Sequence, residues 1–422
     1  MTNTLFNKNT PVSLAIILIG LIPLSSERLE SIFAIIFSLL VVFTVFLKKK
    51  IYNKKIGLGP FIINSTLFLV LLITFLNGIN KEVFRIMETR VSLIVFPILM
   101  YFISVCFNRN EIIRLFNTWK TTFFISCVLF SLIALVLFSI YANPWVPKYG
   151  AQFFQYAVLD HPYFSRHPGY LSVFLNISVL IGVNNLIEKK SILSKMFYGI
   201  GALLSAILIF LFSIKIAIVA LIFSFFALVI IMKIKRTYLL SLFSLLLLAV
   251  TILFIKVPDR FNRFAVFLNP DIVSANQEHN SVFLHKQTIV CAMDIFNKNL
   301  IKGVGIENSK SLVNDCVRET YLYSPNVVYN SHNQYLGYAL NSGIIGLLIL
   351  FFVLFVAFKK SYRKQKLLFS ILVIYSITFL TENIIERQSG VILFSFLINM
   401  ITVLTIKDVK ALKDKTKLFE DK

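Results

Sequence analysis

A histidine–asparagine pair, His332-Asn333, directly precedes a long apolar run. An imidazole that is neutral near pH 7 can take a proton from a hydroxyl group, so His332 is a candidate general base. A titratable side chain at the water boundary of a membrane-spanning helix is costly to keep there without a use. The alternative is a histidine at a helix start that bonds to a loop carbonyl. Asn333 is expected either to orient the imidazole or to cap the helix that begins at Gln334.

Basic residues in the segments that we place on the same side as His332 are candidates for holding a phosphate or pyrophosphate. Arg or Lys binds such an anion and neutralises the charge that develops as it leaves. The candidates are Arg90, Arg166 with His167, Lys215, and Arg260 with Arg263. Lys215 is a lone cation between two apolar runs, and the alternative is a lysine that snorkels at a tight turn. Arg90 would equally serve as an interfacial anchor, and Arg260 and Arg263 as contacts to lipid headgroups.

A polar segment near the C-terminus, at 381–390, supplies carboxylates to the same side. Glu386 and Arg387 are expected to pair, or Glu382 to orient a basic residue of the site; an ion pair at the rim is the alternative. The outer segments contain no DxD, ExD or clustered His/Cys ligand set, which gives a metal site little support. No P-loop or Gly-rich nucleotide fingerprint is found, so we expect no cofactor.

These residues must be positioned by membrane helices. The chain is 57% hydrophobic with 43 Phe and a mean hydropathy of +0.81, which excludes an ordinary soluble domain. We predict an all-α polytopic membrane protein with about twelve spans, because each apolar run is long enough to cross a bilayer core of ~30 Å. The predicted spans are 11–24, 31–47, 60–76, 91–107, 121–141, 169–187, 196–213, 216–232, 238–255, 335–358, 367–380 and 391–406.

The net charge of +22 reflects topology. Seven segments on one side of the predicted spans carry +20 of it, and the remaining loops carry +2. Short loops rich in Lys and Arg stay in the cytoplasm, so we place both termini there, with 407–422 as a cytoplasmic tail. The basic residues are therefore expected to contact anionic membrane lipids, and no nucleic acid. After the first apolar run no small-residue cleavage site follows, so we expect no removed signal peptide.

The whole chain, 1–422, is predicted to be one membrane domain with two long outer loops, at 142–168 and 256–334. The second loop is long enough to need its own structure. Ile289, Met293 and Phe296 mark one face of a helix across 282–299.

Gly303 to Gly305 end that segment as a turn, and 311–330 is expected to form an ordered loop or lid. Cys291 and Cys316 lie in the same loop and would form a disulfide in an oxidising compartment; the sequence leaves their pairing open. Cys106 and Cys127 lie in or beside spans and are expected to be inert packing groups.

Four segments resemble the O-antigen ligase and polymerase family. The His332 segment has the family pattern HNxYLxxxLxxGxxG, with Tyr335, Gly343 and Gly346 in register. The other three are an Arg followed by LxxFP at 88–97, an HPxYL element at 166–171, and ERQSG at 386–390, which resembles an element of Bacteroidetes-type members.

The resemblance implies a glycosyltransferase of the bacterial inner membrane with its active site in the periplasm. Family members transfer a glycan from undecaprenyl pyrophosphate. Ligases pass it to a sugar of the lipid A-core acceptor, and polymerases pass it to another lipid-linked repeat. It implies His332 as the base and arginines as the pyrophosphate ligands. We expect a metal-independent displacement that inverts the anomeric centre.

The chain departs from the family pattern in two places. Ser213-Ile214-Lys215 stands where ligases commonly carry Ser-Arg, and His285-Lys286 stands where many have an Arg before a Trp. Lysine keeps the charge and loses the bidentate fork, so Lys286 is the candidate cation of the large loop. Two alternatives stay open: a polymerase of the same fold, and a lipid-linked glycan transporter, which would need charged or broken helices at mid-membrane.

Overall fold

The computed structural model describes residues 10–48, 56–75, 81–141, 166–212, 214–233, 281–321 and 330–420. Every regular element in these ranges is helical. The first half contains α1 (Thr10–Gly20), η1 (Ile22–Leu24), α2 (Glu27–Leu47), α3 (Gly59–Phe75), α4 (Lys81–Arg90), α5 (Ser92–Cys106), α6 (Arg109–Tyr141), α8 (Pro168–Glu188) and α9 (Ile192–Phe212). The second half contains α10 (Lys215–Met232), α14 (Ser281–Lys298), α15 (Gly305–Tyr321), α16 (Gln334–Ser361), α17 (Lys366–Thr378), η3 (Ile384–Glu386) and α18 (Gln388–Glu420).

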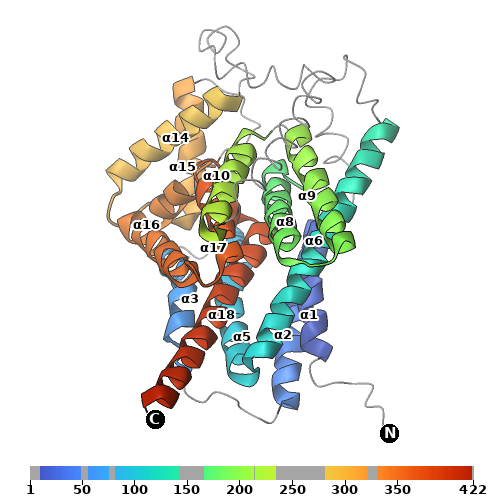
Figure 1. Cartoon of the computed structure of the whole chain (residues 1–422). Coiled ribbons are helices and arrows are strands. Elements are labelled where there is room, and N and C mark those ends of the chain that lie inside the picture. Colours follow the sequence, from blue (N-terminus) through green and yellow to red (C-terminus); the bar gives the residue numbers. More distant parts are fainter. Residues whose placement is uncertain are drawn as a thin grey trace.

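The described helices form eight stretches that are long and apolar enough to cross a membrane, with α4 and α5 together as one of them, and α1, α3 and α17 are shorter apolar helices. A helix covers eleven of the twelve predicted spans; the predicted span 238–255 lies outside the described residues. The described part of the chain is thus the all-helical, polytopic membrane protein that its composition predicts. α8 and the apolar part of α18 are the most deeply buried spans, and the other helices pack around them (Figure 1).

One end of the bundle carries the hairpin of α14 and α15, and the opposite end carries the start of α1 and the end of α18 (Figure 1). Both described chain ends therefore lie away from the hairpin. The hairpin packs on α16, and α15 also contacts α3 and α4. Cys291 and Cys316 form a disulfide between its two helices, which settles the pairing that the sequence left open.

Three local predictions are corrected. The segment 311–330 was expected to be a loop or lid, but α15 continues to Tyr321 because an amphipathic face of Val313 and Val317 packs against α14. The predicted core face of α14 is shifted, since Met293 is 47% exposed while Cys291, Ala292 and Phe296 pack inward.

The third correction concerns α16, which was predicted as one continuous span. Its backbone is broken at Ser342 and Gly343, where φ of Gly343 is +65°. Gly343 permits a close approach of two backbone segments, because an added Cβ would lie 2.1 Å from the carbonyl oxygen of Ile301. The turn between α14 and α15 fills the break, so the hairpin of these two helices is joined to the helix that begins beside His332.

Candidate active site

His332 lies immediately before α16, and the start of this helix is firmly held. The Asn333 side chain caps it, because its Oδ1 accepts from the Leu336 N–H at 3.0 Å while its Nδ2 donates to the Leu380 carbonyl at 3.1 Å. The Gln334 N–H donates to the Phe379 carbonyl at 2.8 Å. Asn333 was expected either to orient the imidazole or to cap the helix, and these contacts are those of a helix cap. Tyr335 is likewise structural, since its hydroxyl donates to the Ser376 carbonyl at 3.0 Å.

The backbone of His332 adopts the left-handed conformation, with φ of +44°. A residue with a Cβ rarely adopts this backbone conformation because it is strained, so surrounding contacts must stabilise it. One such contact is the His332 N–H, which donates to Oδ1 of Asn330 at 3.0 Å. The imidazole Nδ1 is buried and has no hydrogen-bond partner among the described residues. The ring is therefore placed by its backbone, with one nitrogen uncommitted.

A second imidazole lies against the first. His285 of α14 has its ring centroid 4.1 Å from that of His332, at an interplanar angle of 47°. Burial, together with repulsion of the charged form by His285 and His167, lowers the pKa of His332 to about 3. Burial also lowers the pKa of His285, helped by the positive charge of Lys215. Both rings are thus neutral at pH 7 and able to accept a proton.

His167 borders this histidine pair from α8. Its Nδ1 accepts from the Gly169 N–H at 3.2 Å and so caps α8, while burial lowers its pKa to about 4. Glu382 is close by, since a Cβ on Gly169 would lie 3.4 Å from its carboxyl carbon. Burial raises the pKa of Glu382 to about 7, and the positive Arg387 opposes that rise. The guanidinium of Arg387 lies 3.8 Å from Glu27 and above the Tyr170 ring, and its side chain is exposed.

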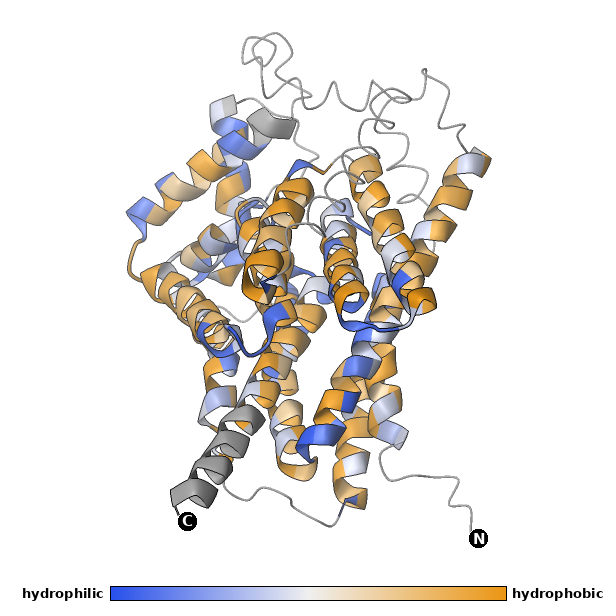
Figure 2. Ribbon diagram, in the orientation of Figure 1, coloured by the Kyte–Doolittle hydropathy of each residue, from blue (hydrophilic) through white to orange (hydrophobic). Residues whose placement is uncertain are grey.

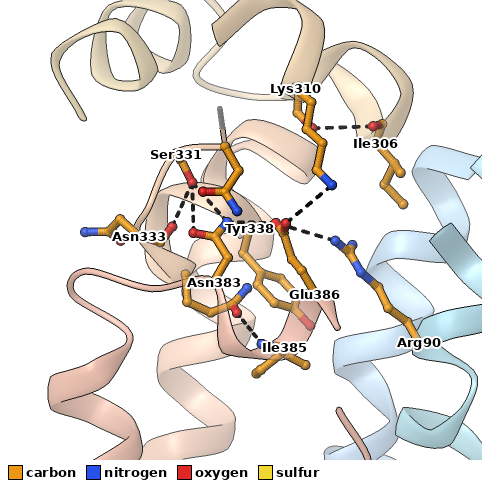
Figure 3. Close-up of polar contacts among 12 residues, drawn as sticks. Arg90, Ile306, Lys310, Ser331, Asn333, Tyr338, Asn383, Ile385 and Glu386 are labelled. Carbon is orange, nitrogen blue, oxygen red and sulfur yellow. Dashed lines mark hydrogen bonds and ion pairs between the residues drawn. The ribbon is translucent and has the colours of Figure 1, made fainter. Parts of the chain in front are cut away.

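A second group of charges lies around Glu386 and is shown in Figure 3. Glu386 Oε1 is 3.6 Å from Arg90 Nη2, and Glu386 Oε2 is 3.8 Å from Lys310 Nζ. Asn383 Nδ2 donates to Glu386 at 2.7 Å and to Ser331 Oγ at 3.1 Å. We call Arg90, Lys310, Asn383 and Glu386 the Arg90 cluster. Asn383 of this cluster bonds to Ser331, which is the residue before His332.

Arg90 is buried but incompletely paired. It is the last residue of α4, and its Nε and Nη1 have no hydrogen-bond partner among the described residues. Its distance to Glu386 is that of an ion pair and exceeds that of a good hydrogen bond. Leaving the hydrogen bonds of a buried guanidinium unmade costs free energy, and a bound anion would accept them. Arg90 therefore retains the capacity to bind an anion. Glu386 thus pairs with Arg90 and Lys310, whereas the predicted partner was Arg387.

The remaining predicted cations are spread over the structure. Arg166 is enclosed by the carboxylate of Glu30 and by the carbonyl oxygens of Ile22 and Ser25, so its charge has structural partners. Lys215 is the first residue of α10 and is half-buried near His285. Lys286 is exposed on α14 beside His285. Arg260 and Arg263 lie outside the described residues.

Lys310 was missed by sequence reasoning. It lies on α15, inside the segment whose helix was not predicted past Gly305, and nothing in its spacing marks it out. His285 was noted only as the neighbour of Lys286, whereas the structure brings His285 itself to His332. Among the described residues no group of three or more His, Cys, Asp or Glu side chains is arranged to hold a metal ion.

Comparison with known families bears on the region just described. Residues 200–351 match the family model described as O-antigen ligase. The match includes α10, α14, α15 and the start of α16, and therefore Lys215, His285 and His332; it leaves out Arg90 and Glu386. No curated protein matches the chain. The family match supports a membrane glycan-processing function of the ligase or polymerase type, with a lipid-linked glycan and an acceptor as partners.

Proposed function

We propose that the protein is an O-antigen ligase. It transfers a glycan from undecaprenyl pyrophosphate to a sugar hydroxyl of lipid A-core at the periplasmic face of the inner membrane. The observation that carries this proposal is the placement of His332 against His285, within the region that matches the O-antigen ligase model. A base and an anion site are the two parts that such a transfer requires.

In the proposed reaction, the acceptor hydroxyl gives its proton to His332 as its oxygen attacks the anomeric carbon of the donor sugar. The bond between that carbon and the pyrophosphate oxygen breaks, and undecaprenyl pyrophosphate leaves with the electron pair. Attack from the opposite face inverts the anomeric centre. A pyrophosphate ester is already a good leaving group, so the step is written without a metal.

Lys215 and Arg90 are the best-supported ligands of the pyrophosphate. Lys215 is close enough to His285 to lower its pKa, and Arg90 has two unpaired buried nitrogens among the described residues. Lys286, Arg260 and Arg263 remain proposed contributors, whereas we leave Arg166 out because Glu30 already balances its charge. An anionic donor would raise the pKa of His332 from its value of about 3, so donor binding itself would strengthen the base.

The break in α16 bears on the transporter alternative, which expects interrupted helices with free backbone groups around a transport site. Here the Ile344 N–H donates to the Leu300 carbonyl at 2.7 Å, and the Leu340 carbonyl accepts from the Val304 N–H at 2.7 Å. Backbone groups on both sides of the break are therefore used by the outer hairpin, which favours an enzyme with a fixed outer site.

The test is transfer in proteoliposomes that contain an undecaprenyl-pyrophosphate glycan, with and without lipid A-core. Glycan appearing on lipid A-core supports the ligase. Lengthening of the donor glycan without lipid A-core would instead make the protein a polymerase, which is the alternative within the same type of chemistry. Absence of transfer with either acceptor would contradict both.

A further inference from the structure

The tip of the hairpin formed by α14 and α15 combines exposed apolar side chains with flanking lysines. Between the two helices, Leu300 is 49% exposed and Ile301 is 72% exposed. Lys298 and Lys302 stand on either side of them and are also exposed. Large apolar side chains at the tip of a polar hairpin are unfavourable in water, so this combination needs a partner.

The tip is fixed in place. Its backbone bonds to both sides of the break in α16, through the Leu300 carbonyl and the Val304 N–H at 2.7 Å each. Gly303 also packs backbone against backbone here, since an added Cβ would lie 2.5 Å from the amide nitrogen of Gly343. The exposed side chains of Leu300 and Ile301 are therefore held at the level where the second half of α16 begins.

That half of α16 presents an exposed apolar stripe. Ile345, Leu348, Phe352 and Phe355 recur at helical spacing and are 53%, 58%, 51% and 63% exposed. The stripe belongs to a candidate membrane span. The Ile344 N–H bonds directly to Leu300, so the tip continues this stripe upward. In Figure 2, the end of α14 is hydrophilic and the connection that follows it is hydrophobic, at the outer edge of the molecule.

We propose that Leu300 and Ile301 insert into the acyl chains of the adjacent bilayer leaflet, and that Lys298 and Lys302 contact its headgroup phosphates. Apolar residues that enter the interface and basic residues that remain at the headgroups are the pattern of an interfacial anchor. A second copy of the chain would be the other cover for such a surface, but the flanking lysines match an anionic headgroup layer. The inference stands on geometry and does not require the proposed reaction.

The anchored tip would fix the position of the candidate site relative to the membrane surface. The hairpin is held at the membrane surface by its anchored tip and by its bonds to the break in α16, and the disulfide holds its two helices together, so it does not open as a lid in water. His285 is carried by this hairpin to His332. If the proposed transfer is correct, the reacting bond of a membrane-anchored donor would meet the histidine pair at the level of the headgroups.

Tryptophan fluorescence tests the anchor in the full-length protein. Ile301→Trp and Leu300→Trp would be reconstituted in vesicles whose acyl chains are brominated, and the emission of the wild type would be subtracted. The matched control is Glu319→Trp, an exposed position near the far end of α15. The proposal predicts blue-shifted emission that brominated chains quench at 300 and 301, with no quenching at 319.

Two results would overturn the proposal. Emission typical of water at position 301, without quenching, would show that the tip does not enter the bilayer. Blue-shifted emission without quenching would show that protein, such as a second copy, covers it. Neither result bears on glycan transfer, so the anchor and the reaction fail or survive separately.

Discussion

Two buried arginines that the sequence presents as equal candidates lie in contrasting surroundings. Arg166 is enclosed where α1, α2 and α8 meet, and its guanidinium is used by Glu30 and two backbone carbonyls. Glu30 in turn accepts a hydrogen bond from the hydroxyl of Ser389. Arg90 lies where α4 meets η3 and the hairpin of α14 and α15, 3.6 Å from Glu386, with Nε and Nη1 unpaired within the described structure.

The difference lies in how completely each charge is satisfied. Both terminal nitrogens of Arg166 are used, and within the described structure only its Nε is without a partner, so its charge stabilises the fold. Arg90 keeps two buried nitrogens without a partner, one of them terminal, so it has more capacity for a ligand than Arg166 has, and unsatisfied groups of this kind concentrate at functional sites. We therefore regard the Arg166 corner as structural and the Arg90 cluster as the part of the protein that can bind an anion.

The largest expected effect is on stability, from Arg166→Met. Removing one partner of a buried ion pair typically costs about 3–5 kcal/mol, because the other charge is left unpaired. We expect a strong fall in the thermal unfolding temperature in detergent. Arg166→Met together with Glu30→Met should recover much of the loss. A stable single variant that has lost only transfer would assign Arg166 to the site and remove the contrast.

Arg90→Met is expected to act mainly on transfer. Loss of one donor that stabilises developing charge typically lowers kcat by about 10²–10³-fold. Unfolding temperature should change less than for Arg166→Met, because Glu386 keeps Lys310 as a partner. Arg85→Met, on the exposed side of the same helix, is the matched control and should leave transfer unchanged. Equal effects of the two α4 variants would contradict the role given to Arg90.

Gly343→Ala tests whether the docked hairpin supports the Arg90 cluster. The new methyl group would meet the Ile301 carbonyl and so undock the hairpin that carries Lys310 and His285. The control is Gly305→Ala, which also has a positive φ, of +83°, but meets no atom within 4 Å. The control should cost only the ~1–2 kcal/mol of the left-handed backbone. Hydrogen exchange in α14 and α15 should rise in Gly343→Ala alone; equal exchange would contradict docking through the break.

The smallest expected effect is a difference between two pH profiles. A histidine whose pKa is lowered stays neutral, and so able to act as a base, as pH falls through the ordinary value of 6.5. With a pKa of about 3 for His332 in the free enzyme, no acid limb of kcat/KM from this residue is expected near 6.5. Bound anionic donor raises that pKa, so the acid limb of kcat should lie at higher pH than that of kcat/KM. Coincident limbs near 6.5 would contradict this electrostatic account.

Much of the fold follows from the sequence because lipid imposes simple rules. Apolar length predicted the helices, and periodicity predicted a helix across 282–299 where α14 is found. The cap at Asn333 was one of the two roles weighed, since short polar side chains before an apolar run commonly cap helices. These features depend on residues that are near one another along the chain.

The site was only partly predictable because it depends on contacts between distant segments. Whether Arg166 or Arg90 is satisfied is decided by Glu30 and Glu386, which lie 136 and 296 residues away. The break in α16 is held by a turn from another helix pair, and Lys310 reaches Glu386 only because that turn docks. No local pattern carries this information. The family pattern presented His332 as a candidate, but not its contact with His285.

The central claim is that His332 is the base of glycan transfer, and single-turnover transfer by His332→Asn in proteoliposomes tests it most directly. Asn accepts the left-handed backbone at this position better than most residues, so the fold should be kept. Donor binding would be measured in parallel. The account predicts a loss of about 10²–10⁴-fold in the rate with donor affinity retained. Transfer at the wild-type rate by a folded His332→Asn protein would contradict it.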